Sequence, residues 1–576
     1  MRKTIRKVLR VLTARERRTM VLLFFLMLVS AVFQSLSVAV VIPFTTSLLN
    51  PGELMTGRLG RLTGMLVPNA DSRSVFHLLV IAMILIFVIK NAYSMWQKYY
   101  YHKVTARIRR RVQHLLLHSY LKKPYAYFIN SDSGDILRTV TVDSDYFLAT
   151  LNHLLTICTN VTVTFFLFLV IIAIDFRLTL LSVCLLGIEY LIILRLIRPF
   201  LRKHGKRYRE ALGRGNSLII ETLRGVKTIK VSGKESFIEK RYAGFVDKLA
   251  HAQMIERSFS SAPQYFMEAM TVSALLVLLL AAYHAQSDLT GIIPTLSAFG
   301  VAVFKIMPDI SSISSSVSYI GYYEGSVSRV EQICCEPVQE ETGEKKADRL
   351  SFDREIRMEG ITFSYHPENA PVLQDASFTV PCGKRIGIQG TSGRGKTTLV
   401  DILLGLLQPQ AGTVLLDDIV RHTDTREWQN LFAYVPQNVF MMAGTIRENI
   451  VFGEEEKQFD PERFRSALET AQLTEFVDSL PEGTGTDVGE AGVRLSGGQI
   501  QRIGIARALY ADAPVLILDE ATSALDPETE SAVLNALSGL QGRKTIIMIT
   551  HKQSAVRDFD LLYTVENQKV ILKKQD

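Results

Sequence analysis

Gly390-Thr-Ser-Gly-Arg-Gly-Lys396-Thr397 follows the pattern G-x-x-x-x-G-K-T, which is typical of a phosphate-binding loop. The apolar residues 385–389 before it predict a short strand, and residues 398–405 after it predict a helix. Its three glycines allow backbone N–H groups to curl around phosphate oxygens, and the helix start adds a partial positive charge. The stretch therefore predicts an α/β nucleotide-binding domain, with Lys396 on the terminal phosphates and Thr397 on Mg²⁺.

Two carboxylates follow a second apolar strand pattern further along the chain. Residues 515–518 are Val-Leu-Ile-Leu, and Asp519 and Glu520 come directly after them. We expect Asp519 to hold Mg²⁺, directly or through water, and Glu520 to polarise the attacking water as general base. A lone Leu-Asp-Glu is a weak signal, but it gains weight from following the phosphate loop at this distance.

Three more residues gain meaning from this set. Gln437 lies between the two motifs, where a polar side chain would touch both Mg²⁺ and a neighbouring domain; the alternative is an ordinary surface-loop glutamine. His551 follows the strand pattern at 545–550 and is a candidate for the γ-phosphate, although a lone histidine there is more often structural. Tyr365 is a candidate for stacking on adenine, although a single aromatic residue is more often part of the core.

A second glycine-containing helix start lies at Leu495-Ser496-Gly497-Gly498-Gln499, and residues 500–510 predict the helix. Serine and paired glycines at a helix start form an anion site. One chain thus carries two phosphate-binding elements.

The composition of the whole chain indicates a membrane protein. It has 576 residues, 48% of them hydrophobic and 21% charged, and its mean hydropathy is +0.17. The net charge of +8 suggests nucleic acid at first sight. However, the basic residues cluster beside apolar stretches, as within residues 2–18, which is the positive-inside pattern. The five cysteines are scattered and predict neither a metal site nor a disulfide framework.

The first half contains six stretches long and apolar enough to cross a membrane, since a span needs ~20 apolar residues. Even parity and a basic N-terminus put both ends of the chain in the cytoplasm. Residues 1–18 predict an amphipathic helix on the cytoplasmic surface. The predicted spans are about 20–46, 75–99, 154–174, 178–197, 259–283 and 291–313.

The loops between these spans are asymmetric. The long polar stretches 100–153 and 198–258 have helical periodicity, so we expect the spans to continue into the cytoplasm and to end in short connecting helices near 127–133 and 231–239. The external link 47–74 predicts an amphipathic helix, either on the outer membrane interface or in an ordinary loop. The predicted organisation is a segment at 1–18, a membrane domain at 19–330, a linker at 331–349 and an ATPase domain at 350–576.

The motifs, in this order and spacing, make the chain resemble the ABC transporter family, specifically half-size exporters of the type IV fold. The resemblance implies a homodimer in the cytoplasmic (inner) membrane, with Mg²⁺ and ATP sandwiched between two chains. Glu520, His551, Lys396 and Gln437 would be catalytic, and Thr397, Gln437 and Asp519 would bind the metal. Arg394 and Lys552 are unusual occupants of their motif positions. The implied ATP site comprises Tyr365, Val372, Thr391, Ser392, Gly393, Arg394, Gly395, Lys396, Thr397 and Thr398 of one chain, and Ser496, Gly497, Gly498 and Gln499 of its partner.

Charged residues inside the spans are the candidates for binding cargo, because a charge in a membrane is costly. Lys90 and Lys305 in a dimer would give four positive charges around one cavity, which suits an anionic group such as a diphosphate. The alternative is local pairing and snorkelling. The stretches 262–268, 287–293 and 305–308 resemble PglK-type flippases of lipid-linked oligosaccharides. The implied cargo is a polyprenyl-diphosphate-linked oligosaccharide, or a similar anionic lipid, contacted by Lys90, Gln264, Glu268 and Lys305.

Other functions share the same ATPase residues. An exporter of amphipathic drugs, peptides or simple lipids would not need the lysines. A non-transporting, ATP-gated regulator would not need the intact hydrolytic residues Glu520 and Ser496. Import of metal chelates finds no cysteine or histidine cluster in the spans to support it.

Overall fold

The computed structural model describes residues 2–39, 72–174, 187, 195, 210–284, 289–336, 350–366, 368–391, 393–454, 456–552 and 559–575. They fall into two compact units. The first, here the membrane unit, is residues 1–123 and 130–338, and the second, the ATPase unit, is residues 124–129 and 339–576.

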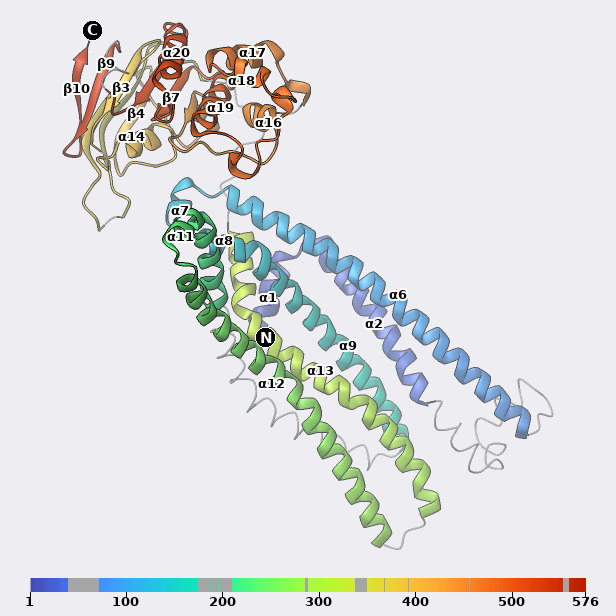
Figure 1. The fold of residues 1–576 in the computed structure, drawn as a ribbon. Helices are drawn as coiled ribbons and strands as arrows, with labels where there is room; N and C mark the ends of the chain where they lie inside the picture. Colours follow the sequence, from blue (N-terminus) through green and yellow to red (C-terminus); the bar gives the residue numbers. More distant parts are fainter. Residues whose placement is uncertain are drawn as a thin grey trace. The chain divides into compact units, whose positions relative to one another are not determined.

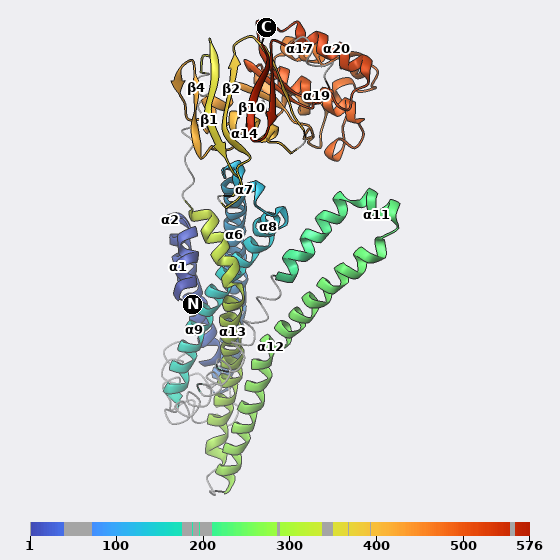
Figure 2. The same cartoon turned by 90° about the vertical axis from the view of Figure 1, so that its left-hand side faces the viewer.

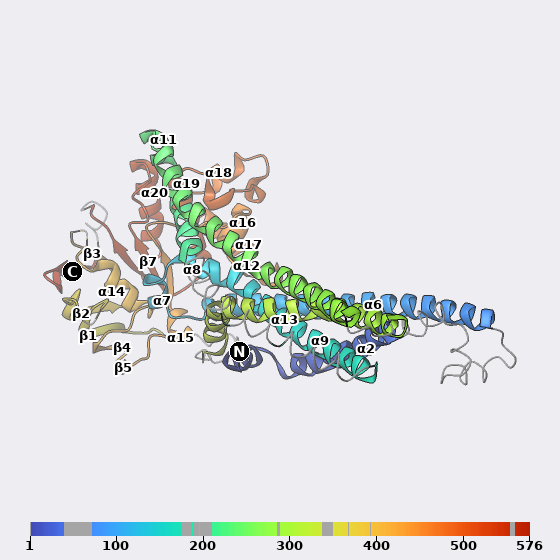
Figure 3. The same cartoon turned by 90° about the horizontal axis from the view of Figure 1, so that it is seen from below.

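The membrane unit is helical throughout its described part, and its longest helices run beside one another (Figures 1 and 3). Residues 210–224 are also helical. The helices are α1 (Arg2–Val11), α2 (Ala14–Ala39), α6 (Ser72–Leu121), α8 (Ser133–Arg138), the π-helix η1 (Thr139–Asp143), α9 (Ser144–Ile174), α11 (Val226–Ser232), α12 (Glu235–His284) and α13 (Leu289–Cys335).

The described helices cover most of the predicted spans. Three segments are long and apolar enough to cross a membrane, namely Ala14–Ser37, Val80–Leu121 and Ser133–Leu169. The predicted spans at 259–283 and 291–313 form parts of α12 and α13. The predicted span at 178–197, apart from the helical residues 187 and 195, and almost all of the external link at 47–74 lie outside the described residues.

The helices extend far beyond the apolar stretches, as predicted, and α6 and α12 each have 50 residues. Two short helices, α7 (Tyr125–Ile129) and α8, lie around the first predicted connection. The second connecting helix was wrongly predicted at 231–239, because the short helix is α11, at 226–232 (Figure 2). Gly233 has φ +59° and ends α11 in the left-handed conformation that favours glycine, and α12 then begins at Glu235.

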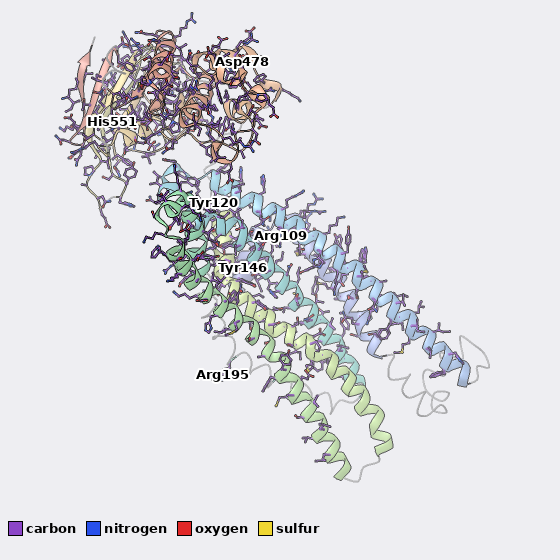
Figure 4. All side chains as sticks on the ribbon, in the orientation of Figure 1. Arg109, Tyr120, Tyr146, Arg195, Asp478 and His551 are labelled. Atoms are coloured by element: carbon purple, nitrogen blue, oxygen red, sulfur yellow. The ribbon has the colours of Figure 1, made fainter. Side chains whose placement is uncertain are left out.

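Aromatic stacking joins α9 to α13 in the interior of the membrane unit. The His153 ring stacks on Tyr319 with 4.7 Å between centroids, and Tyr146 stacks on Tyr323 at 4.5 Å. Ion pairs tie other helices together, such as Arg109 of α6 with Asp145 of α9 at 3.4 Å; Arg109 and Tyr146 are labelled in Figure 4. The unit is therefore held by side-chain packing between long helices.

The basic N-terminal segment forms α1, which docks on the C-terminal part of α13. Lys7 Nζ donates to Ser328 Oγ at 2.7 Å, and Arg10 pairs with Glu331 at 3.0 Å. Since α13 continues to Cys335, the predicted linker at 331–349 begins inside this helix. Residues 337–349 lie outside the described part of the chain.

Two sheets form the framework of the ATPase unit (Figure 2). The antiparallel sheet has the order β2-β1-β4-β5, and the larger, mostly parallel sheet has the order β10-β9-β3-β8-β7-β6. The strands are β1 (Glu355–Phe363), β2 (Leu373–Pro381), β3 (Arg385–Gln389), β4 (Ala411–Leu416), β5 (Ile419–Val420), β6 (Phe432–Val435), β7 (Val515–Asp519), β8 (Thr545–Ile549), β9 (Leu561–Glu566) and β10 (Lys569–Gln575).

Helices cover the larger sheet and complete two hydrophobic cores. One core lies between the two sheets and includes Trp428, which is fully buried and donates from Nε1 to Leu403 O at 2.8 Å. The other joins β6 and β7 to the helical part. Besides α7, the helices are α14 (Lys396–Leu403), α15 (Arg426–Gln429), α16 (Ile446–Val451), α17 (Pro461–Thr470), α18 (Thr474–Asp478), α19 (Gly497–Tyr510) and α20 (Pro527–Ser538), with short 3₁₀ turns at Glu456–Gln458, Gly483–Gly485 and Glu490–Gly492.

Candidate functional site: the nucleotide site of the ATPase unit

Four parallel strands bring the predicted site residues to one edge of the sheet. Strands β3, β8, β7 and β6 pair in parallel, so their carboxyl ends lie together. The phosphate loop follows β3, Asp519 ends β7 and Glu520 follows it, His551 follows β8, and Gln437 follows β6. Groups that are up to 161 positions apart in the chain (from Gly390 to His551) therefore converge, which is the usual place for a ligand in an open α/β sheet.

The phosphate loop has backbone geometry that only glycine tolerates. Gly390 has φ +145°, and a Cβ there would lie 2.7 Å from Val565 O. Gly395 has φ +99°, and its Cβ would lie 3.0 Å from Val372 Cγ1. Helix α14 begins immediately afterwards, at Lys396. The loop therefore presents the start of a helix to the edge of the sheet, as an anion site requires.

The Lys396 side chain folds back across this loop. Its Nζ donates to Gly390 O at 2.7 Å and to Thr391 O at 3.2 Å. The residue is buried, and burial lowers the pKa of its ammonium although Glu520 and Asp519 act in the opposite direction. The positive charge is thus fixed where the terminal phosphates of a nucleotide are predicted to bind.

Glu520 is held at both carboxylate oxygens. Gln437 Nε2 donates to Oε2 at 2.7 Å, and His551 Nε2 lies 3.1 Å from Oε1. His551 Nε2 is also 3.3 Å from Lys396 Nζ, so the imidazole lies between the carboxylate and the loop lysine (His551 is labelled in Figure 4). The structure brings these four predicted catalytic residues together, in an arrangement that can orient a water for attack on a phosphate.

The backbone of Glu520 is strained. Its φ is +49°, in the left-handed region that a residue with a long side chain rarely adopts. The Glu520 N–H donates to Ile549 O of β8 at 2.9 Å, which anchors the residue in this conformation. Strain of this kind persists where the surroundings over-determine it, and it gathers at functional sites.

Sequence reasoning missed two residues around Asp519. The hydroxyl of Tyr434 in β6 donates to Asp519 Oδ2 at 3.2 Å. Asp401 in α14 is also buried, and burial followed by the charge of Asp519 raises its pKa to about 6. Burial raises the pKa of Asp519 as well, while Tyr434 and Lys396 oppose that rise. A cation beside Asp519 would relieve this crowding of negative charge.

The donor atoms near Asp519 fit Mg²⁺. A hydroxyl at Thr397, an amide oxygen at Gln437 and a carboxylate at Asp519 are hard oxygen ligands, and Mg²⁺ in nucleotide sites binds one or two carboxylates plus phosphate oxygens. Gln437 uses Nε2 on Glu520, which leaves its carbonyl oxygen for a metal. In the described part of the chain, no group of three His, Cys, Asp or Glu residues could hold a metal ion. Binding of Mg²⁺ therefore needs the hydroxyl and amide oxygens and the phosphates of the nucleotide.

The remaining predicted contacts lie around the loop. The Tyr365 hydroxyl and Thr398 Oγ1 share a hydrogen bond of 3.0 Å, and 38% of Tyr365 is exposed, which leaves ring surface for stacking. Arg394 Nε donates to Thr391 Oγ1 at 3.3 Å, so its unusual side chain braces the loop. Ser392 lies outside the described residues.

Lys552 is the unusual residue directly after His551. Its Nζ donates to Glu530 Oε2 at 2.6 Å, which explains a cation at this position.

The second anion element starts α19. Ser496 is the N-cap and forms a capping box, in which Ser496 Oγ accepts from Gln499 N at 3.3 Å and Gln499 Oε1 accepts from Ser496 N at 2.8 Å. The Ser496 hydroxyl proton stays available for donation to a ligand. Contacts of Ser496, Gly497 and Gly498 with the nucleotide of a second chain stay predictions.

The predicted cargo residues are spread over three long helices. The Lys90 ammonium on α6 lies 4.5 Å from the centroid of the Phe87 ring on the same helix. Glu268 is exposed on α12. Gln264 and Lys305 lie on α12 and α13, and their side chains fall outside the described part of the structure. Whether the four meet in one site therefore stays a prediction.

Both halves of the chain match known families. Residues 373–523 match the ABC transporter family, and residues 54–299 match the ABC transporter transmembrane region. An ATP-dependent lipid A-core flippase of Cupriavidus pinatubonensis is 30% identical over 466 residues, which are 80% of this chain and 77% of that protein. The chain belongs to the ABC transporter family. The predicted fold class, a helical membrane domain followed by an α/β ATPase domain, is confirmed, and so is ATP hydrolysis coupled to translocation.

Two more matches support the exporter organisation. An ATP-dependent lipid A-core flippase of Ralstonia nicotianae is 28% identical over 493 residues, covering 84% of this chain and 82% of that protein. A bacterial Atm1-family ABC exporter with ATP bound has the same fold, with a TM-score of 0.78, 22% identity, and coverage of 97% of this chain and 95% of that one. The protein is thus a multi-pass ABC transporter with an exporter-type fold and an ATPase domain.

Proposed function

We propose that this ABC exporter flips a polyprenyl-diphosphate-linked oligosaccharide, or a similar anionic lipid, from the inner to the outer leaflet of the cytoplasmic membrane. The observation that carries the lipid cargo is the similarity over four-fifths of the chain to proteins named lipid A-core flippases. The diphosphate and the glycan rest on the intramembrane lysines and on the resemblance of the stretches around Gln264, Glu268 and Lys305 to oligosaccharide flippases.

Lys90 is the described residue that argues for an anionic group. Its side chain is half-buried on a helix long and apolar enough to cross a membrane. The neighbouring Phe87 ring attracts the ammonium by about 0.5–2 kcal/mol, which is less than a membrane-buried cation needs. The ring neutralises no charge, so the ammonium keeps its donors for a phosphate oxygen. Lysine lacks the planar fork of arginine, so a bidentate fit to diphosphate is not expected.

We further propose that two identical chains form the transporter. In this arrangement Lys396, Thr397 and Asp519 of one chain act on the same Mg²⁺-bound ATP as Ser496 and Gly498 of the partner chain. Glu520 takes the proton of the attacking water, and His551 and Gln437 hold its carboxylate in place. All these groups are intact in one sequence, which favours two competent sites.

The second candidate is an exporter of amphipathic drugs, peptides or simple lipids. The contact of Lys90 with Phe87 of its own helix favours it, because a lysine whose stem packs along its helix can carry the ammonium toward the membrane surface without binding cargo. A basal ATPase stimulated by apolar cations, and unaffected by Lys90→Ala, would support this candidate over the first.

The test is a leaflet assay in proteoliposomes loaded with a fluorescent polyprenyl-diphosphate oligosaccharide. We expect ATP to move the lipid between leaflets, and Glu520→Gln to stop that movement without loss of folded protein. A protein that hydrolyses ATP normally but moves none of this lipid would overturn the proposed cargo.

A further inference from the structure

Gln501 is a buried amide in α19 that lies outside every motif identified in the sequence, with 5% of its surface exposed. All its hydrogen bonds reach the turn that follows β7. Its Nε2 donates to Ser523 Oγ at 3.1 Å and to Glu520 O at 3.4 Å, and its Oε1 accepts from Ala524 N at 2.9 Å. One side chain therefore binds both ends of the turn 520–524.

This turn carries the proposed base in a strained conformation. Glu520 has φ +49°, and a free turn would relax toward a more favourable backbone geometry. Three groups oppose that relaxation. Ile549 O accepts from the Glu520 N–H, and the Glu520 carbonyl accepts from both Ser523 N at 3.1 Å and Gln501 Nε2 at 3.4 Å. Gln501 thus acts on the peptide group that directly follows the base.

The start of α19 packs on the same turn. A Cβ at Gly497 would lie 3.5 Å from Ala524 Cβ, and a Cβ at Gly498 would lie 3.1 Å from Ala524 O. The Ala524 N–H therefore donates to Gln501, and its carbonyl side lies close against the backbone of Gly498. The first two turns of α19 and the turn 520–524 form one tightly connected piece.

We propose that Gln501 is a positioning residue for ATP hydrolysis that fixes the Glu520 turn to the Ser496–Gly498 helix start. Within one chain it holds the carboxylate of Glu520 at the angle where His551 and Gln437 reach it. In the dimer proposed above, Glu520 and Ser496 of one chain serve different ATP molecules. Gln501 then couples the two sites mechanically, and this second statement rests on the proposed dimer.

The decisive variant is Gln501→Met in the full-length transporter in nanodiscs, because methionine keeps the length of the side chain and removes all three hydrogen bonds. Residues that orient metal ligands by hydrogen bonds contribute about 10–100-fold to activity, and by analogy we expect kcat to fall by about that factor. The Kd for ATP stays unchanged, because Lys396 and the phosphate loop are untouched. Ser523→Ala removes one of the three bonds and is expected to lower kcat less.

A matched control separates positioning from stability. Thr545→Val removes the buried hydrogen bond from Gly383 N to Thr545 Oγ1, which is 2.8 Å long and lies at the opposite end of β8 from His551. Thermal unfolding midpoints are measured for both variants. We expect Thr545→Val to lower the midpoint and leave kcat per folded molecule unchanged.

The value of kcat tests the positioning role, and the Hill coefficient for ATP tests the coupling between the two sites. If Gln501→Met keeps its kcat, or if Thr545→Val loses kcat in the same proportion, the positioning role is overturned. The Hill coefficient for ATP tests the coupling: a fall toward 1 supports it, whereas a reduced kcat with an unchanged Hill coefficient keeps the positioning role and overturns the coupling. Neither readout involves the cargo, so failure of the proposed lipid flipping would leave this test intact.

Discussion

The ATPase unit and the membrane unit differ in how their functional side chains are positioned. In the ATPase unit, each functional side chain follows the end of a strand, and short hydrogen bonds connect Lys396, Gln437, Glu520 and His551 to one another or to the loop. In the membrane unit, the candidate residues Lys90 and Glu268 sit on separate 50-residue helices. The residues for ATP hydrolysis lie in local sequence motifs. Cargo binding instead depends on side chains that only tertiary packing can bring together.

This difference has a physical origin. A parallel sheet fixes which ends of its strands are neighbours, so a motif after a strand has a known place. A long helix presents a new face every residue, and its partner sets which face lines a cavity.

Glu520→Gln should have the largest effect. The amide keeps the shape of the side chain but cannot take a proton from water, and a general base contributes about 10²–10⁴-fold. We expect kcat to fall within that range while ATP still binds. Phosphate release measured on purified transporter checks this, and normal turnover in the variant would remove Glu520 from its proposed role.

Lys396→Met should weaken ATP binding without unfolding the ATPase unit. It removes a charge-assisted hydrogen bond to phosphate, of about 1.5–3 kcal/mol, which corresponds to roughly 10–150-fold in Kd. A fluorescent ATP analogue titrated against the variant measures this. Exposed Lys573, in the part of β10 that pairs with the start of β9, provides a control through Lys573→Met, and an equal loss in both variants would contradict the assignment.

Lys90→Ala combined with Lys305→Ala tests the membrane side. We expect flipping of the diphosphate-linked lipid to fall by about 10-fold or more, as the loss of one charged hydrogen bond predicts, while basal ATP hydrolysis stays unchanged. Lys103→Ala changes an exposed lysine on α6 outside the predicted span and serves as the control. Equal loss of flipping and hydrolysis in a folded double variant would argue against a cargo role.

Asp401 should produce the smallest effect, which depends on pH. Its folded pKa is about 6, above the ordinary 3.8, so the native state binds the proton more tightly than the unfolded state. Stability therefore declines as pH rises from about 4 to 6, by at most about 3 kcal/mol. Asp401→Asn should raise the unfolding midpoint relative to wild type at pH 7 but not at pH 4. A pH-independent difference would contradict this cause.

The sequence predicted the residues of the nucleotide site, but it did not predict the residues that hold them in place. Glycine patterns and strand-end carboxylates are visible in one dimension, which is why Gly395, Asp519 and His551 could be placed at one edge. Tyr434, Asp401 and Gln501 carry no such signal, because a single polar residue inside an apolar pattern looks the same whether it faces solvent or a buried carboxylate. Only the tertiary fold reveals that Gln501 faces the turn 520–524.

In the membrane half, the sequence predicted helices but not the contacts between them. The extension of α6 and α12 beyond the apolar stretches followed from helical periodicity. The position of α11 was missed because Gly233 ends it, and glycine alone does not say on which side of it a helix lies. The stacking of His153 on Tyr319 joins residues far apart in the chain, which periodicity cannot reveal.

The most direct test of ATP-driven lipid flipping is to measure hydrolysis and leaflet exchange in the same proteoliposomes, with the diphosphate-linked lipid as the only candidate cargo. We expect flipping to require ATP and to stop with Glu520→Gln. In the double variant Lys90→Ala with Lys305→Ala, we expect hydrolysis to continue while flipping is lost. Sustained hydrolysis by the wild-type protein with no movement of this lipid would contradict it.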